Sequence, residues 1–166
     1  PESSDRLKDV SFATEAQNPA LFDWLEILAT DLGGSPFRIE ASQREAYHAS
    51  AVMACGLVAG LTGLAAEMWE PLGIDRADAL KRIIPILRAT VDALDEKGLP
   101  AAMTGPFVRG DVETVASHLA ATSKNSPETG RAYAALAEAS LHIAKEQGGL
   151  SNEAFDRIKT LLSDEN

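Results

Sequence analysis

The sequence predicts a mainly α-helical fold preceded by a short strand-helix-strand unit. Three observations support this prediction. Two short β-prone segments flank one helix before residue 40, apolar residues recur at helical spacing after it, and a capping residue precedes each of those apolar runs. We therefore expect two parts, residues 1–40 and residues 41–166. A chain of 166 residues is long enough to bury a core.

The first forty residues read as a strand, a helix and a second strand. We expect strands at 10–16 and 36–39, and a helix that begins after Asn18 as its N-cap, with Pro19 in its first turn. A helix that joins two strands usually lays them parallel, and parallel sheets are normally covered on both faces. Two strands and one helix leave sheet edges and apolar surface open, so we expect a missing remainder of the sheet or a partner there.

The remainder of the chain reads as a series of helices. Ser42 and Glu45 have the spacing of a capping box, which would open a long helix that runs to about Glu70. Pro85 is expected to kink the next helix, because proline removes one backbone hydrogen bond. The N-caps expected for the later helices are Asp75, Asp111, Ser126 and Ser151.

The long helix contains an uncharged stretch from Ala49 to Ala66, at the lower length limit of a membrane span. Twelve of its eighteen residues are Ala, Gly, Ser, Thr or Cys, and it lacks aromatic and basic flanks. We therefore predict a buried helix in a bundle and no membrane insertion. Gly56 and Gly60 lie on one stripe of small residues, which predicts a close helix contact within the bundle or across a dimer, with a ligand groove as the alternative.

Composition narrows the class of protein. The net charge of −10 argues against nucleic-acid binding, because phosphate recognition needs clustered Lys and Arg. The single cysteine, Cys55, excludes an internal disulfide and a cysteine-based zinc site, and it fits a reducing cytoplasm. We expect Cys55 to be a packing residue.

Residues 101–119 hold the most site-like pattern. Asp111 belongs to an Arg-Gly-Asp tripeptide, but an N-cap role explains it better than adhesion does. Pro106 forces Gly105 away from helical geometry, so the chain must turn there. The Thr104 hydroxyl, a nearby amide and the Arg109 guanidinium could then hold a carboxylate or a phosphate. The alternative is that Thr104 and Arg109 only fasten the loop to neighbouring carbonyls.

Among the histidines, His48 is the candidate for chemistry. It stands where the uncharged stretch begins, and a histidine at such an edge could donate a proton or hold a substrate. His118 and His142 lie inside helices, where a surface role or a satisfied core role is usual. No histidine or carboxylate pair has metal-ligand spacing, and the glycine-rich nucleotide fingerprint is absent.

Three segments together resemble the last part of a two-domain family: VSFATEAQNPALFDWLEILATDLGGSPFRI, REAYHASAVMACGLVAGL and MTGPFVRGDVETVASHLAAT. Members of that family join a Rossmann-like NAD(P)-binding domain to a helical C-terminal domain of unknown function, similar to the C-terminal domain of 6-phosphogluconate dehydrogenase. The resemblance runs from about Leu7 to Leu162, and its most specific parts are Tyr47-His48 and the segment from Thr104 to Asp111.

The resemblance implies an NAD(P)-dependent oxidoreductase of unassigned small-molecule substrate. It makes residues 1–40 the tail of the nucleotide domain, so NAD or NADP would belong to the full-length protein and this chain alone would bind none. It implies a homodimer, a catalytic His48, and substrate contacts from Thr104, Gly105, Pro106 and Arg109. Gly56 stands where members commonly carry an Asn, which puts catalytic competence in question. The alternative is a non-catalytic helical dimerisation module.

Overall fold

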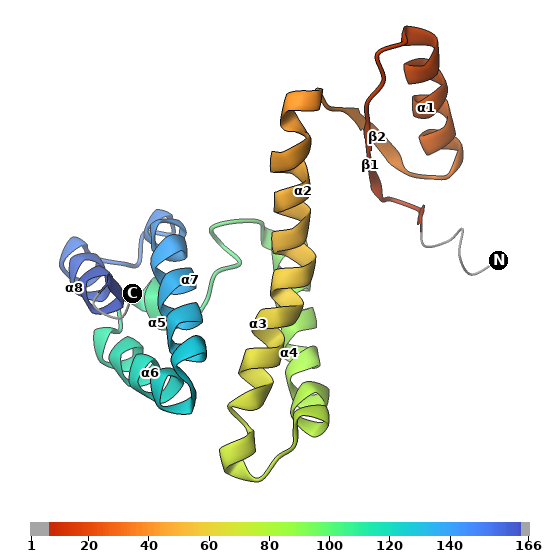
Figure 1. Cartoon of the computed structure of the whole chain (residues 1–166). Coiled ribbons are helices and arrows are strands. Elements are labelled where there is room, and N and C mark those ends of the chain that lie inside the picture. The colour runs from red at the N-terminus through yellow and green to blue at the C-terminus, as the bar shows by residue number, and fades with distance from the viewer. Residues whose placement is uncertain (1–6, 164–166) are drawn as a thin grey trace. The chain divides into compact units, whose positions relative to one another are not determined.

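The computed structural model describes residues 7–163 and is mainly helical, with one two-stranded parallel sheet near its start (Figure 1). The predicted fold class is thus confirmed at this level. The elements are β1 (Ser11–Thr14), α1 (Pro19–Asp31), β2 (Ser35–Arg38), α2 (Arg44–Val52), α3 (Val58–Glu67), α4 (Arg76–Lys97), α5 (Pro106–Arg109), α6 (Val112–Asn125), α7 (Pro127–Glu146) and α8 (Asn152–Ser163).

The chain forms two compact units, one up to Leu57 and one from Val58, which we describe separately. The division falls inside one helical stretch, because α2 is followed by a π-helical segment at Met53–Leu57 and then by α3. The predicted domain boundary after residue 40 stays a prediction. The two compact units divide between Leu57 and Val58, and compactness alone does not define a domain.

The first unit contains the predicted strand-helix-strand arrangement. β1 and β2 pair in parallel, with Ser11 opposite Ser35 and Thr14 opposite Arg38. The Asn18 side chain accepts hydrogen bonds from the amides of Ala20 and Leu21, which confirms it as the N-cap of α1.

The apolar side chains of the first unit are only partly buried. Phe22 and Ala29 of α1 are buried, and the Arg38 guanidinium lies 4.4 Å from the centre of the Phe22 ring. Trp24 and Ile27 are 55% and 60% exposed. Among residues 7–163 each strand has a single neighbour, so the expected open edges and open apolar face are present.

The start of the long helix differs from the prediction. The Glu40 amide donates to the Gln43 side chain at 2.8 Å, whereas the Ser42–Glu45 capping box does not form. The physical reason is a 3₁₀ turn at Ala41–Gln43 that comes before α2 and places Ser42 inside the turn.

The expectation of a buried central helix is wrong for this chain. No residue of α2 or of the π-helical segment is buried, and Ala66 is the buried residue of α3. Cys55 is exposed and therefore does not serve as a packing residue. A Cβ added to Gly56 or to Gly60 would meet no atom within 4 Å, so the close contact expected inside the bundle is absent from the described residues.

The same stretch, Ala41–Leu72, is long and apolar enough to cross a membrane by length and composition, with a mean hydropathy of 1.8 in its most apolar window. Core helices of soluble proteins pass this test too, but only 6% of that window is buried here. The described chain thus leaves a long apolar helix uncovered.

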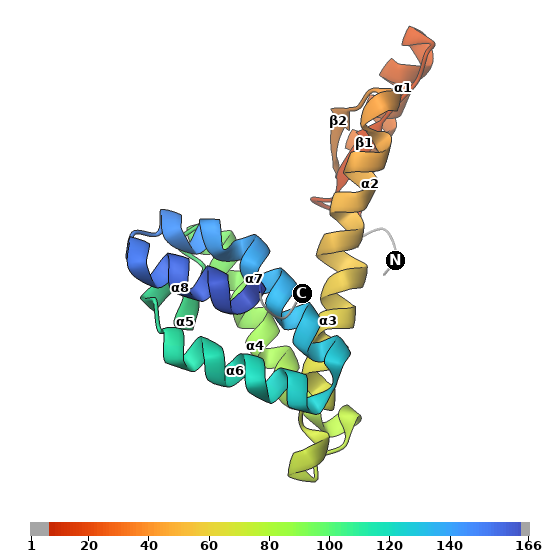
Figure 2. The ribbon, with the colours of Figure 1, turned by 60° about the vertical axis from the view of Figure 1, so that its left-hand side comes forward.

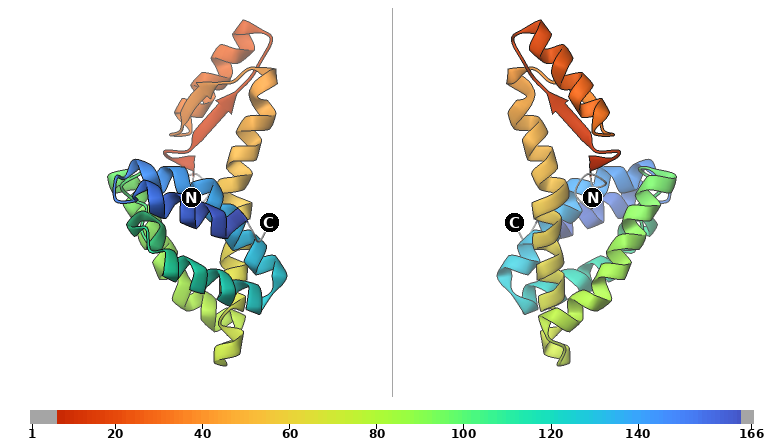
Figure 3. Two further views of the ribbon diagram at one scale, coloured as in Figure 1. Left: turned by 90° about the vertical axis from the view of Figure 1, so that its left-hand side faces the viewer. Right: turned by 90° about the vertical axis from the view of Figure 1, so that its right-hand side faces the viewer.

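The second unit combines a helical pair with a three-helix core. α3 and α4 form an antiparallel pair joined by a turn (Figure 3). α4 is capped by Asp75, continues through Pro85 and ends at Lys97, with Gly98 as its C-cap. α6, α7 and α8 lie side by side (Figure 2) around a buried cluster. Its members are Val115, Leu119, Ala134, Ala137, Leu141, Ala144, Leu150, Ile158 and Leu162.

The predicted caps of these helices are confirmed. Asp111 accepts from the Thr114 amide at 3.0 Å, and Ser126 accepts from the Thr129 amide at 3.0 Å. Ser151 accepts from the Ala154 amide at 3.1 Å. These three bonds fix where α6, α7 and α8 begin.

Gly130 allows α7 to lie directly against α6. A Cβ at this position would meet the Ser123 Oγ and would come within 2.9 Å of the Ser123 Cα. We expect Gly130→Ala to lower the free energy of unfolding by about 1–3 kcal/mol, because a rigid backbone neighbour cannot move aside cheaply. Urea unfolding followed by circular dichroism measures this change.

Gly60→Ala is the matched control when both variants are unfolded at a protein concentration that keeps the chain monomeric, because its new methyl group would then meet open space. This variant should unfold at equal or slightly higher urea concentration, since alanine favours helix by roughly 0.5–1 kcal/mol over glycine. Equal losses in both variants would contradict the close α6–α7 contact as the cause.

Candidate functional site

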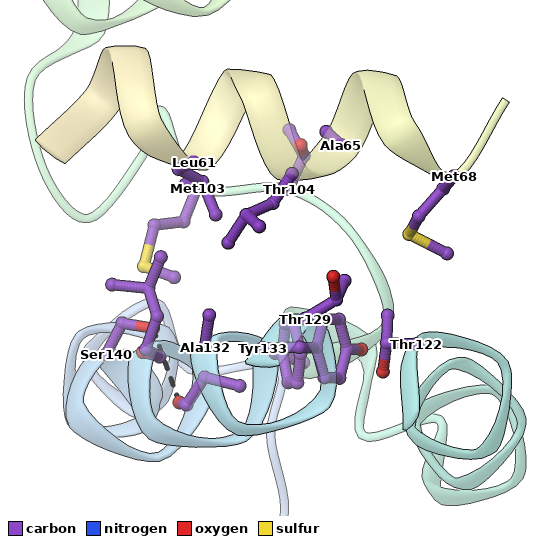
Figure 4. Close-up of a pocket in the computed structure, with 14 residues that line it drawn as sticks. Leu61, Ala65, Met68, Met103, Thr104, Thr122, Thr129, Ala132, Tyr133 and Ser140 are labelled. Atoms are coloured by element: carbon purple, nitrogen blue, oxygen red, sulfur yellow. Dashed lines mark hydrogen bonds between the residues drawn. The ribbon is translucent and has the colours of Figure 1, made fainter. Parts of the chain in front are cut away.

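The second unit holds a pocket of about 360 Å³ between α3 and α7. Leu61 and Ala65 of α3, with Met68 just after that helix, form one wall, and Ala132 and Tyr133 of α7 form the facing wall (Figure 4). Met103 and Thr104 of the loop before α5 also line it, together with Phe107 of α5 and Thr122 of α6. The size lies within the range of small-molecule sites.

The pocket wall is almost entirely apolar and includes no charged residue. Most of its hydroxyl groups are already used within their own helices. Thr122 donates to the carbonyls of His118 and Leu119, and Ser140 donates to the Leu136 carbonyl. Thr129 pairs with Ser126 at 2.8 Å. Thr104 and Tyr133 therefore carry the hydroxyl groups that remain for a ligand.

Tyr133 is the polar group with the clearest geometry. Its hydroxyl lies 3.2 Å from Nδ1 of His118, and the two rings meet edge to face with centroids 6.1 Å apart. Phe107 lies against the same tyrosine, with ring centroids 6.0 Å apart. Burial raises the pKa of Tyr133 to about 12, so the phenol stays protonated at physiological pH.

The predicted substrate loop reaches this pocket only in part. Thr104 lies in the pocket wall. Gly105 has φ of +98° and is the N-cap of α5, with Pro106 as the first residue of that helix, as the sequence required a turn here. Arg109 ends α5, is exposed, and is not among the residues that line the pocket.

The loop before α5 is fastened by a residue that the sequence analysis did not consider. Gln147 Nε2 donates to the carbonyls of Ala101 and Met103 at 3.2 and 3.4 Å. No local spacing signals this contact, because Gln147 lies more than forty residues further along the chain. The bonds hold Met103 and Thr104 in the pocket wall.

The Asp111 carboxylate interacts with the first turn of α6, as an N-cap residue does. Hydrogen bonds from the side chain and the amide of Thr114 lower the pKa of its carboxyl group, and nearby Arg109 adds a smaller effect in the same direction. The carboxylate is therefore engaged by the first turn of α6. This geometry fits the N-cap interpretation of the Arg-Gly-Asp tripeptide.

His48 lies in the first unit, in a hollow of about 500 Å³ that Glu15, Arg44 and Tyr47 also line. Two guanidinium nitrogens of Arg44 bond to the Glu15 carboxylate at 2.8–3.1 Å, and these bonds raise the pKa of Arg44. His48 itself is exposed. The hollow is therefore lined by an ion pair, whereas the pocket of the second unit has no charged residue in its wall.

His48 and the segment from Thr104 to Arg109 belong to different units. Each is described within its own unit, so a site that joins them stays a prediction. Within the part of the chain described, no group of three or more His, Cys, Asp or Glu side chains could hold a metal ion. The arrangement therefore offers an ion-paired hollow around His48 and a separate apolar pocket with a tyrosine hydroxyl.

The chain belongs to the family described as a domain of unknown function (DUF2520), whose family model matches residues 10–140. The match covers the elements from β1 to α6 and most of α7. No curated protein and no solved structure matches the chain.

Tyr133→Phe tests the burial of the phenol. A tyrosine whose pKa is about 12 in the folded state and about 10 when unfolded stabilises the fold fully below pH 10. That contribution is lost as the pH rises from 10 through 12. After allowance for partial exposure, we expect wild type to lose about 1 kcal/mol more than Tyr133→Phe between pH 8 and pH 12. Urea unfolding at both pH values measures the difference, and parallel losses would contradict it.

Proposed function

We propose that the chain is the C-terminal part of a cytoplasmic NAD(P)-dependent oxidoreductase that acts on a small molecule. In this proposal the helices after residue 40 form a bundle of the 6-phosphogluconate dehydrogenase C-terminal-like type, bind the substrate and pair into a homodimer. The resemblance of the three quoted segments supports this proposal, and the family description is compatible with it.

One observation of the structure carries the proposal. β1 and β2 are parallel and are joined by α1, an arrangement that normally belongs to a larger sheet covered on both faces. Here the described residues supply two strands and one helix, and Trp24 and Ile27 stay more than half exposed. A nucleotide-binding domain of Rossmann type would add the strands and helices that cover this surface.

The proposed roles follow the positions of the side chains. His48 lies in an open hollow, where it is free to donate a proton to a bound substrate. Thr104 lines the apolar pocket, and Gly105 and Pro106 shape the turn that holds it there. Arg109 is exposed and free to meet an anionic group of the substrate or cofactor.

Nucleotide binding by the protein expressed from the full reading frame tests the proposal. We expect the full-length protein to bind NADH or NADPH, measured by energy transfer from tryptophan to the reduced nicotinamide, and we expect the 166-residue chain alone to give no such signal. A full-length protein that binds neither nucleotide would refute the oxidoreductase assignment. His48→Gln in the full-length protein should keep nucleotide binding, because the proposal places this residue at the substrate.

A second candidate function is a non-catalytic dimerisation module. The observation that favours it is the uncovered helical stretch from α2 to α3, where Gly56, Gly60 and Gly63 face open space. Ile86 and Val91 of α4 are also more than half exposed. A second copy of the chain could bury this surface, and the glycines would let two helix backbones approach closely.

Gly60→Leu tests whether the stripe is a dimer contact. We expect wild type to sediment as a dimer in analytical ultracentrifugation and Gly60→Leu to dissociate at least tenfold more readily, because the leucine would separate the helices. Lys159→Leu is the matched control, since it adds the same side chain at an exposed position of α8. A monomeric wild type at high concentration, or equal effects of both substitutions, would remove the dimer proposal.

A further inference from the structure

We propose that the pocket between α3 and α7 binds the neutral, mainly apolar part of a substrate, and that the Tyr133 hydroxyl donates a hydrogen bond to a carbonyl oxygen there. This inference rests on the proposed substrate-binding role and names the substrate class. The occupant is a small neutral ketone, aldehyde or ester with an aliphatic or aromatic body.

The wall of the pocket selects against charge. Its side chains include leucines, alanines, methionines and aromatic rings, and no Lys, Arg or His is among them to neutralise an anion. Moving a carboxylate out of water into such a site is strongly unfavourable unless a partner charge is present. Arg109 lies outside the wall, so an anionic group of the ligand would have to remain outside the pocket.

Two helices contribute the side chains at the polar end of the pocket. Tyr133 of α7 lines the pocket, and His118 of α6 meets its hydroxyl at 3.2 Å. When the Nδ1–H tautomer of His118 donates to the tyrosine oxygen, the phenol hydrogen is left for a ligand.

The other hydroxyl groups do not compete for the same role. Thr122, Thr129 and Ser140 have partners on α6 and α7. Thr104 sits on the loop held by Gln147 and is the second group able to reach a ligand oxygen. One phenol in an apolar wall therefore gives directional recognition of a single acceptor, which is what a carbonyl group presents.

The methionines of the chain provide a direct measurement. The sequence has three, and Met68 and Met103 line the pocket whereas Met53 belongs to the other unit. In protein labelled with ¹³C at the methionine methyl groups, the probe 4-phenylbutan-2-one should shift the Met68 and Met103 signals and leave Met53 unmoved. The carboxylate analogue 4-phenylbutanoate should bind at least tenfold more weakly, and butylbenzene, which lacks the oxygen, about fivefold more weakly.

Tyr133→Phe should remove the preference for the ketone over butylbenzene, because the two probes then find the same apolar site. Tyr47→Phe is the matched control, since it removes a tyrosine hydroxyl from the first unit and should keep the preference. The ranking of the three probes on wild type tests the inference even where Tyr133→Phe does not fold.

Three results would overturn the inference: no shift of Met68 or Met103 up to the solubility limit of the ketone, equal binding of the carboxylate, or an unchanged preference in folded Tyr133→Phe. The experiment needs no nucleotide, so its failure is distinguishable from that of the proposed function. The ketone could bind as expected although the full-length protein binds no NAD(P)H. That pair of results would support the pocket and refute only the oxidoreductase assignment.

Discussion

The contact of α7 with α6 and α8 is the constraint on which the site depends. Gly130 lets the backbone of α7 approach Ser123 of α6, and the buried leucines, valine, isoleucine and alanines of the three helices fill the space between them. This packing sets the rotation of α7. It therefore places Tyr133 beside His118 on one side and in the pocket wall on the other.

The rest of the described chain is much less enclosed. α1 has one buried face and one exposed apolar face, and the helical stretch from α2 to α3 has Ala66 as its buried residue. Because burial of apolar surface drives both folding and association, these open faces are the physical observation on which both proposed functions rest. The proposed nucleotide-binding domain and a second copy of the chain would cover different parts of this surface, so the dimer contact is compatible with either proposed function.

Local sequence rules predicted much of the fold. Asn18, Asp75, Asp111, Ser126 and Ser151 were each placed correctly as caps, because a cap depends only on residues within one turn. The capping box at Ser42 was wrong, since the inserted 3₁₀ turn moved the helix start. The burial of the long helix was wrong too, because composition records how apolar a helix is and carries no information on what covers it.

The sequence alone determined the helical class, the strand-helix-strand start and most element boundaries, since each of these follows from spacing and from interactions between near neighbours. Only the tertiary structure decided the pocket. Tyr133 and His118 lie fifteen residues apart on separate helices, and Gln147 reaches a loop more than forty residues away. Such contacts arise when helices pack at a particular rotation, and that rotation depends on the side-chain volumes of all of them together.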